Sequence, residues 1–77
     1  MEEFLRYVLG SLVEFPDDLV IKKNETPSTV AFLIGAKPSD IPKIIGKSGN
    51  TIRALRTLLN ASAQKRHMTA TLEIIEP

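Results

Sequence analysis

Residues 44–55 read IIGKSGNTIRAL, and this stretch decides the fold that the 77-residue sequence predicts. An aliphatic pair precedes four residues that begin and end with glycine, Gly46-Lys47-Ser48-Gly49. Glycine allows the backbone to take tight turn angles and to approach a ligand closely. The segment therefore predicts a turn between two helices, a short one at about residues 40–45 and a longer one at about residues 50–63.

Residue types on both sides of the turn agree with this interpretation. Ser39 is a good N-cap, Asp40 suits the first turn of a helix, and Pro42 is tolerated where its missing N–H would be unpaired anyway. The longer helix is expected to face inward with three aliphatic residues at helical spacing, Ile52, Leu55 and Leu59.

The rest of the sequence predicts one more helix and three strands. Apolar residues recur at helical spacing over residues 2–14 and form one broad stripe, and Pro16 ends that helix. The residues of this stripe are Phe4, Leu5, Val8, Leu9, Leu12 and Val13. Alternating apolar and β-branched residues predict strands at residues 19–23, 29–36 and 68–75, and Phe32 is expected in the core. The order is α-β-β-α-α-β, an α+β single domain over residues 1–77 with its helices on one face of a three-stranded mixed sheet.

Composition and charge narrow the class of protein. Hydrophobic residues make up 43% and charged residues 25%, as in ordinary globular domains, and the absence of cysteine excludes disulfides. The acidic start is unlike a secretory signal, and the apolar stretch at residues 4–15 is too short to span a bilayer, so we expect a cytoplasmic protein. Net charge is only +1, but residues 1–20 carry −4 and residues 37–66 carry +6. A segregated basic half attracts phosphates, although a solvated charged face is the plainer interpretation of charge alone.

The central stretch resembles the signature of the K-homology (KH) family. That signature is an aliphatic pair, GxxG, and aliphatic residues three and six positions after the second glycine, here Ile52 and Leu55. The α-β-β-α-α-β order is similar to the type II version of the KH fold. The length and the early helix also look like the KhpA family of stand-alone bacterial KH proteins. The resemblance covers essentially the whole chain.

The turn leads into a helix N-terminus, where unpaired N–H groups and the helix dipole favour an anion. Lys47 and Ser48 can reach phosphate oxygens there by charge and by hydroxyl. The resemblance implies a groove that clamps about four nucleotides of single-stranded RNA, in an RNA chaperone or post-transcriptional regulator. Plain core packing for Ile52 and a solvated face for the arginines are the alternatives. The expected RNA-binding residues are Ile45, Gly46, Lys47, Ser48, Gly49, Ile52, Arg53, Arg56, Lys65 and Arg66.

A second face of the long helix carries Ala54, Leu58 and Ala61, small residues around one leucine. This stripe suggests a homodimer interface, and the alternative is partial burial against the chain's own sheet. The resemblance implies self-association and a larger KH-containing partner of the KhpB (Jag) kind. A protein–protein adaptor, with RNA contact secondary, is therefore the rival function.

Other signals in the sequence point to no further chemistry. Gly46-Lys47-Ser48 is like the end of a P-loop, but Ile41 stands where that motif needs glycine. His67 is a single histidine without metal-ligand partners, so no metal or cofactor is expected. Glu73 and Glu76 are expected as solvent-facing charges, and no nucleophile and base stand out, so we expect no enzyme.

Overall fold

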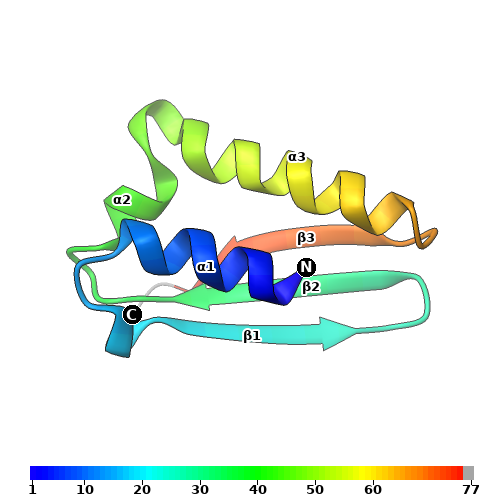
Figure 1. Cartoon of the computed structure of the whole chain (residues 1–77), viewed down its shortest axis with the longest axis horizontal. Helices are drawn as coiled ribbons and strands as arrows, with labels where there is room; N and C mark the ends of the chain where they lie inside the picture. The colour runs from blue at the N-terminus through cyan, green and yellow to red at the C-terminus, as the bar shows by residue number, and fades with distance from the viewer. Residues whose placement is uncertain (76–77) are drawn as a thin grey trace.

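The computed structural model describes residues 1–75 and has the predicted order of elements (Figure 1). Its helices and strands begin and end within two residues of the predicted positions, and short 3₁₀ turns are added after the first helix and between the last two. Their bounds are α1 Glu2–Leu12, η1 Pro16–Asp18, β1 Val20–Glu25, β2 Thr29–Gly35, α2 Ile41–Ile45, η2 Lys47–Gly49, α3 Asn50–Gln64 and β3 Thr69–Ile74.

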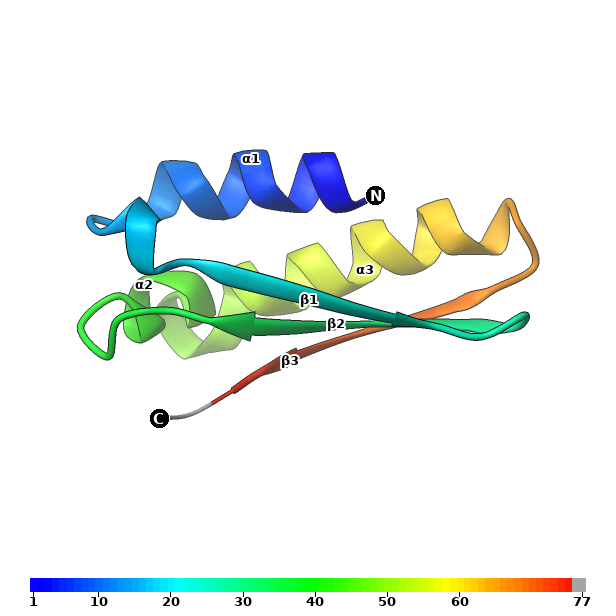
Figure 2. The same ribbon diagram turned by 90° about the horizontal axis from the view of Figure 1, so that it is seen from below.

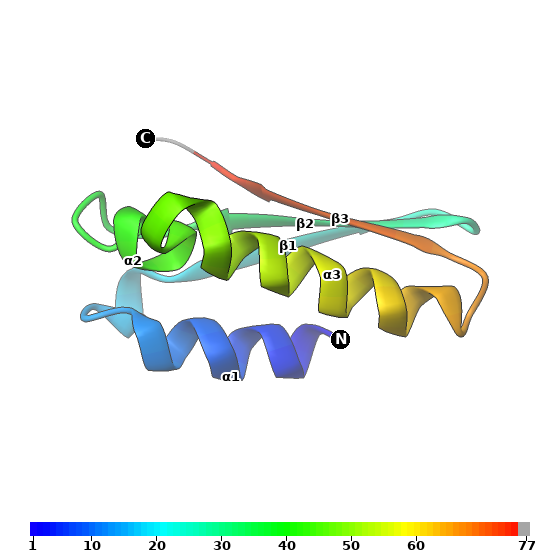
Figure 3. The same ribbon diagram turned by 90° about the horizontal axis from the view of Figure 1, so that it is seen from above.

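The three strands form one mixed sheet, as expected, and their order in the sheet is β1-β2-β3. β1 and β2 are antiparallel, with Val20 opposite Gly35, whereas β2 and β3 are parallel, with Thr29 opposite Thr69. Parallel neighbours need a long crossover, and here α2, the turn and α3 supply it. Seen along the sheet, α1 and α3 lie on the same face, and no element within residues 1–75 covers the other face (Figures 2 and 3).

The core lies between that covered face and the helices. On β2, Val30, Phe32 and Ile34 alternate inward and are fully buried, so the prediction for Phe32 is confirmed. Every second residue of β2 is buried, and every third or fourth residue of the helices that pack on it is buried in turn. The helices, the residue that follows α1 and β3 contribute the remaining buried hydrophobic residues, namely Leu5, Leu9, Val13, Ile44, Ile52, Leu55, Leu59, Ala63, Ala70 and Leu72.

The start of α2 differs from the prediction, because Asp40 and not Ser39 is its N-cap. The Asp40 side chain does not cap its own helix. Its carboxylate is fully buried and accepts hydrogen bonds at 3.0 Å from the backbone N–H groups of Glu14 and Phe15, in the connection that follows α1. Lys43 Nζ lies 3.4 Å from the same carboxylate and 3.3 Å from that of Glu14. Asp40 therefore ties the end of α1 to the start of α2.

Two remaining expectations concern the surface. Glu73 is exposed on β3, as expected, whereas Glu76 lies outside the described residues. Among residues 1–75, no helix is long and apolar enough to cross a membrane.

The Asp40 contacts predict how stability depends on pH. Burial raises the pKa of Asp40, but the two backbone N–H donors and Lys43 outweigh it, so the pKa lies below its ordinary value. The unfolded state then binds more protons near pH 4, and stability falls as the pH drops from about 4 through the folded pKa. We expect Asp40→Asn to lower the Tm at pH 7 and to flatten this acid loss.

Thermal denaturation followed by circular dichroism between pH 7 and pH 3 measures both effects. Asp17→Asn is the matched control, because it removes one exposed carboxylate from the neighbouring turn. An Asp40→Asn profile parallel to those of the wild type and the control would contradict the role of Asp40.

Candidate nucleic-acid interface

The GxxG turn (residues 46–49) has a backbone that few sequences can adopt. Gly46, Ser48 and Gly49 have φ angles of 79°, 55° and 75°, in the left-handed range that favours glycine. A Cβ at Gly46 would overlap the Thr51 side chain and lie 2.9 Å from the Thr51 backbone nitrogen. A Cβ at Gly49 would have more room, since its nearest neighbour is Arg53 Nη2 at 3.5 Å. Gly46 is therefore required by space and by backbone angle, and Gly49 by angle alone.

The turn leaves hydrogen-bond donors free beside the first turn of α3. Gly49 N–H donates to Gly46 C=O and Asn50 N–H donates to Lys47 C=O. In residues 1–75, the N–H groups of Lys47 and Ser48 have no acceptor, and both side chains are exposed. Free N–H groups at the N-terminus of a 15-residue helix attract an anion such as phosphate.

One flank of α3 faces the outer edge of the sheet. Arg56 Nε donates to Leu72 C=O at 3.1 Å, and Asn60 Oδ1 accepts from Ala70 N–H at 3.0 Å. Both contacts reach β3, the edge strand. An open hollow of about 500 Å³ runs along α3 and is lined by Arg53, Arg56, Thr57, Asn60, Ala61 and Gln64. A second hollow of about 320 Å³ lies between the Arg56–Asn60 pair and residues 70–73 of β3.

The two isoleucines expected in the groove floor differ in what they expose. Ile52 is only 7% exposed and packs in the core, whereas Ile45 is half-buried against it. Core packing is therefore the main role of Ile52. Ile45, which directly precedes the turn, has more surface to offer a ligand.

Comparison with known proteins places this geometry in a family. Residues 2–74 match the family described as "KhpA/KhpB, KH domain". The chain belongs to this family.

Relatives of the KhpA type match over almost their full length. A Chlamydia pneumoniae protein is 41% identical over 99% of this chain and 97% of its own, and a Chlamydia trachomatis protein is 40% identical over the same shares. A Listeria monocytogenes protein is 36% identical over 99% of this chain and all of its own. Each is named an RNA-binding protein KhpA. No solved structure gives a significant match. The resemblance inferred from residues 44–55 is thus confirmed at the level of the family.

In this KH domain the seven basic residues between positions 37 and 66 divide into two groups. Lys37 Nζ lies 3.9 Å from the centre of the Phe15 ring, and Lys43 pairs with Glu14 and Asp40, so both serve the fold. The other five, which form no salt bridge within residues 1–75, are Lys47, Arg53, Arg56, Lys65 and Arg66.

These five cations, all exposed, follow α3 from one end to the other. Lys47 precedes the helix, whereas Lys65 and Arg66 follow its last turn, about 22 Å away along 15 residues. The structure therefore places Lys65 and Arg66 at the far end of the helix from the turn, and does not bring them together with Lys47 and Ser48.

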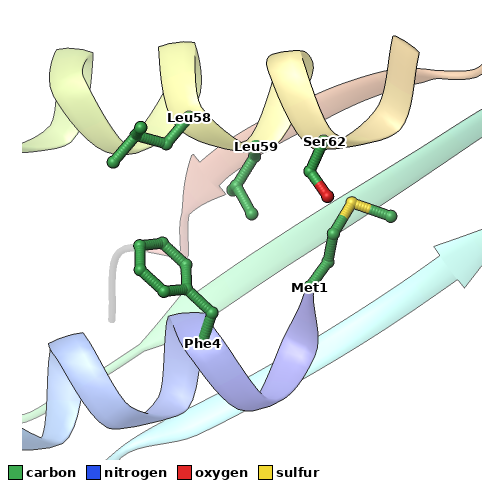
Figure 4. Close-up of a pocket in the computed structure, with 5 residues that line it drawn as sticks. All are labelled: Met1, Phe4, Leu58, Leu59 and Ser62. Atoms are coloured by element: carbon green, nitrogen blue, oxygen red, sulfur yellow. The ribbon is translucent and has the colours of Figure 1, made fainter. Parts of the chain in front are cut away.

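The face suggested for dimerisation is open. Leu58 is 53% exposed, and Ala54 and Ala61 are exposed too, so the alternative of partial burial against the sheet is wrong. Leu58 points into an apolar groove of about 280 Å³ between α1 and α3, whose other walls are Met1, Phe4, Leu59 and Ser62 (Figure 4).

Sequence reasoning assigned Phe4 to the inward stripe of α1, yet it is 43% exposed, and Tyr7 is 78% exposed. Only Leu5 and Leu9 of α1 are fully buried. The width of the apolar stripe could have indicated this exposure, because the stripe is broader than the face that a helix can bury in so small a domain.

The two glycines predict unequal effects of one substitution. Gly46→Ala should lower the free energy of unfolding by about 2–4 kcal/mol, because it adds a clash with Thr51 to an unfavourable φ. Gly49→Ala should cost about 1–2 kcal/mol, because only the backbone angle is unfavourable. Urea denaturation of both variants measures the difference, and equal losses would show that the contact with Thr51 is relieved by a small shift.

Proposed function

We propose that the chain is a small cytoplasmic RNA-binding protein whose GxxG turn holds the backbone of about four nucleotides of single-stranded RNA. The observation that carries this proposal is the pair of free N–H groups on Lys47 and Ser48, at the start of a helix along which five cations have no acidic partner among residues 1–75. The relatives' printed names, RNA-binding protein KhpA, support the same ligand class. A role as RNA chaperone or post-transcriptional regulator, without catalysis, fits a binding module of this size.

Two kinds of contact follow from the geometry. Phosphates bind at the turn, where Lys47 and Ser48 offer charge, hydroxyl and backbone donors. Bases then lie in the hollow along α3 and in the one between α3 and β3, which share the guanidinium of Arg56. The Nε of Arg56 donates to Leu72, and its other nitrogens can contact bases. Ile45 offers an apolar surface just before the turn. Lys65 and Arg66 lie where RNA that runs along the whole of α3 would leave the helix.

Neither of the two hollows beside α3 offers an aromatic ring for base stacking. Phe32 is buried, and Phe4, Tyr7 and Phe15 belong to α1 and the segment after it, none of them lining either hollow. Stacking on aromatic side chains supplies much of the affinity in many single-strand binders. We therefore expect weak binding that tolerates many sequences and depends strongly on phosphate contacts.

The proposal predicts that charge reversal at the turn abolishes binding. Lys47→Asp/Ser48→Asp should weaken binding of a labelled single-stranded RNA pool at least tenfold, because negative charge replaces both phosphate contacts. Binding of the wild type should fall as salt rises, since binding releases counterions. Fluorescence anisotropy at two salt concentrations measures both effects, with circular dichroism to confirm folding.

Lys22→Asp/Asn24→Asp is the matched control for the turn variant. It changes charge by the same amount on exposed β1 residues whose side chains point to the uncovered face of the sheet. Equal binding by the turn variant and the wild type, or no binding by the wild type, would contradict the proposal and favour an adaptor.

A second function, a protein–protein adaptor, is favoured by the exposed apolar face between α1 and α3. Phe4 and Leu58 are large and exposed there, and the exposed Ala54 and Ala61 of α3 would let another helix approach closely. We propose this face as the contact in a homodimer, or in a heteromer with a larger KH-containing protein of the KhpB (Jag) kind. An interface would stabilise a small core, and two linked grooves would gain avidity for RNA.

The adaptor function predicts that Leu58→Asp lowers the mass in solution. A buried aspartate without a partner is unfavourable at an apolar interface, so a dimeric wild type should become monomeric in sedimentation. Val20→Asp is the matched control, because Val20 is a similarly exposed aliphatic residue, 44% exposed, on the opposite side of the sheet. A wild type and a Leu58→Asp variant that are both monomeric would contradict self-association through this face.

A further inference from the structure

The side chain of Arg53 turns back from the flank of α3 and contacts the GxxG turn. Its Nη2 donates a hydrogen bond at 3.0 Å to the backbone carbonyl of Ser48, five residues earlier and inside the GxxG turn. The same nitrogen lies 3.5 Å from the point where a Cβ of Gly49 would stand. The guanidinium therefore lies against the Ser48–Gly49 peptide.

This contact fixes a peptide that is already held at its other end. The peptide group is planar, with its C=O and N–H pointing in opposite directions. The Ser48 carbonyl accepts from Arg53, while the Gly49 N–H donates to Gly46 C=O at 3.1 Å. With both ends bound, the peptide plane cannot rotate without losing two hydrogen bonds.

The orientation matters because of the neighbouring donors. Ser48 has φ of 55°, which is unfavourable for a residue with a side chain, so its conformation needs support. Rotation of the Ser48–Gly49 peptide would also move a carbonyl oxygen, the negative end of the peptide dipole, relative to the free N–H groups of Lys47 and Ser48. A carbonyl oxygen that faces a phosphate would repel it.

We infer that Arg53 is a positioning residue: it braces the GxxG turn through the Ser48 carbonyl, so that the Lys47 and Ser48 N–H groups stay open to a phosphate. The inference rests on the proposed RNA-binding function. It separates Arg53 from Lys47, whose side chain contacts phosphate directly, and from Arg56, whose hydrogen bond goes to β3.

The first measurement uses the free protein. In Arg53→Met, the backbone amide NMR signals of Lys47, Ser48 and Gly49 should shift and their hydrogen exchange should speed up. Arg56→Met is the matched control, because it removes a second guanidinium from the same helix flank, and its changes should concentrate at residues 70–73. Unchanged turn signals in a folded Arg53→Met would overturn the inference.

The second measurement is RNA affinity against salt for Arg53→Met and Lys47→Met. Loss of a hydrogen bond of this kind should weaken binding about threefold to tenfold. The slope of log affinity against log salt should fall by about one for Lys47→Met, and by less than half as much for Arg53→Met. An equal fall in slope would make Arg53 a direct phosphate contact and overturn the inference. If the wild type binds no RNA, the proposed function fails, and the inference stands or falls on the amide signals alone.

Discussion

The absence of a side chain at position 46 is the constraint on which the rest of the structure depends. Thr51 occupies the space that a Cβ there would need, so any residue other than glycine would strain the approach of α2 to α3. The resulting crossover returns the chain to the covered face of the sheet and lets β3 pair parallel to β2. Within residues 1–75, the same turn leaves the N–H groups of Lys47 and Ser48 without an acceptor. The fold and the proposed binding surface thus have one local cause.

A buried carboxylate makes the corresponding connection in the other half of the chain. Asp40 satisfies two N–H groups of the segment after α1 and pairs with Lys43, so it fixes the helix that leads into the turn. Acidic Glu14 and basic Lys43 neutralise one another near Asp40, whereas the cations farther along the chain keep no acidic partner among residues 1–75. The basic residue near Asp40 therefore serves the fold, and the basic residues along α3 stay exposed on the surface.

The sequence predicts the order of elements and the turn because both are local properties. The spacing of Ile52, Leu55 and Leu59 defines a helix face, and two glycines three positions apart define a turn, without knowledge of distant contacts. The backbone partners of Asp40 lie 25 and 26 residues away, whereas local propensity favoured Ser39 as the cap. The exposure of Phe4 was missed for the same reason, because the width of a buried stripe depends on where α3 lies. Both features depend on contacts between segments far apart in the sequence, which local patterns do not specify.

Helix α3 shows why a domain of this size gives single residues two tasks. Its inner face supplies core residues, while Arg56 and Asn60 bind backbone groups of β3, an edge strand that would otherwise offer unpaired groups to another chain. Arg56 and Asn60, which line the hollow between α3 and β3, therefore also protect the edge of the sheet. Arg53 does the same for the turn. If the proposed function holds, a substitution that frees one of these side chains to bind RNA would also expose the edge strand or loosen the turn, so RNA binding and stability would be coupled through this helix flank.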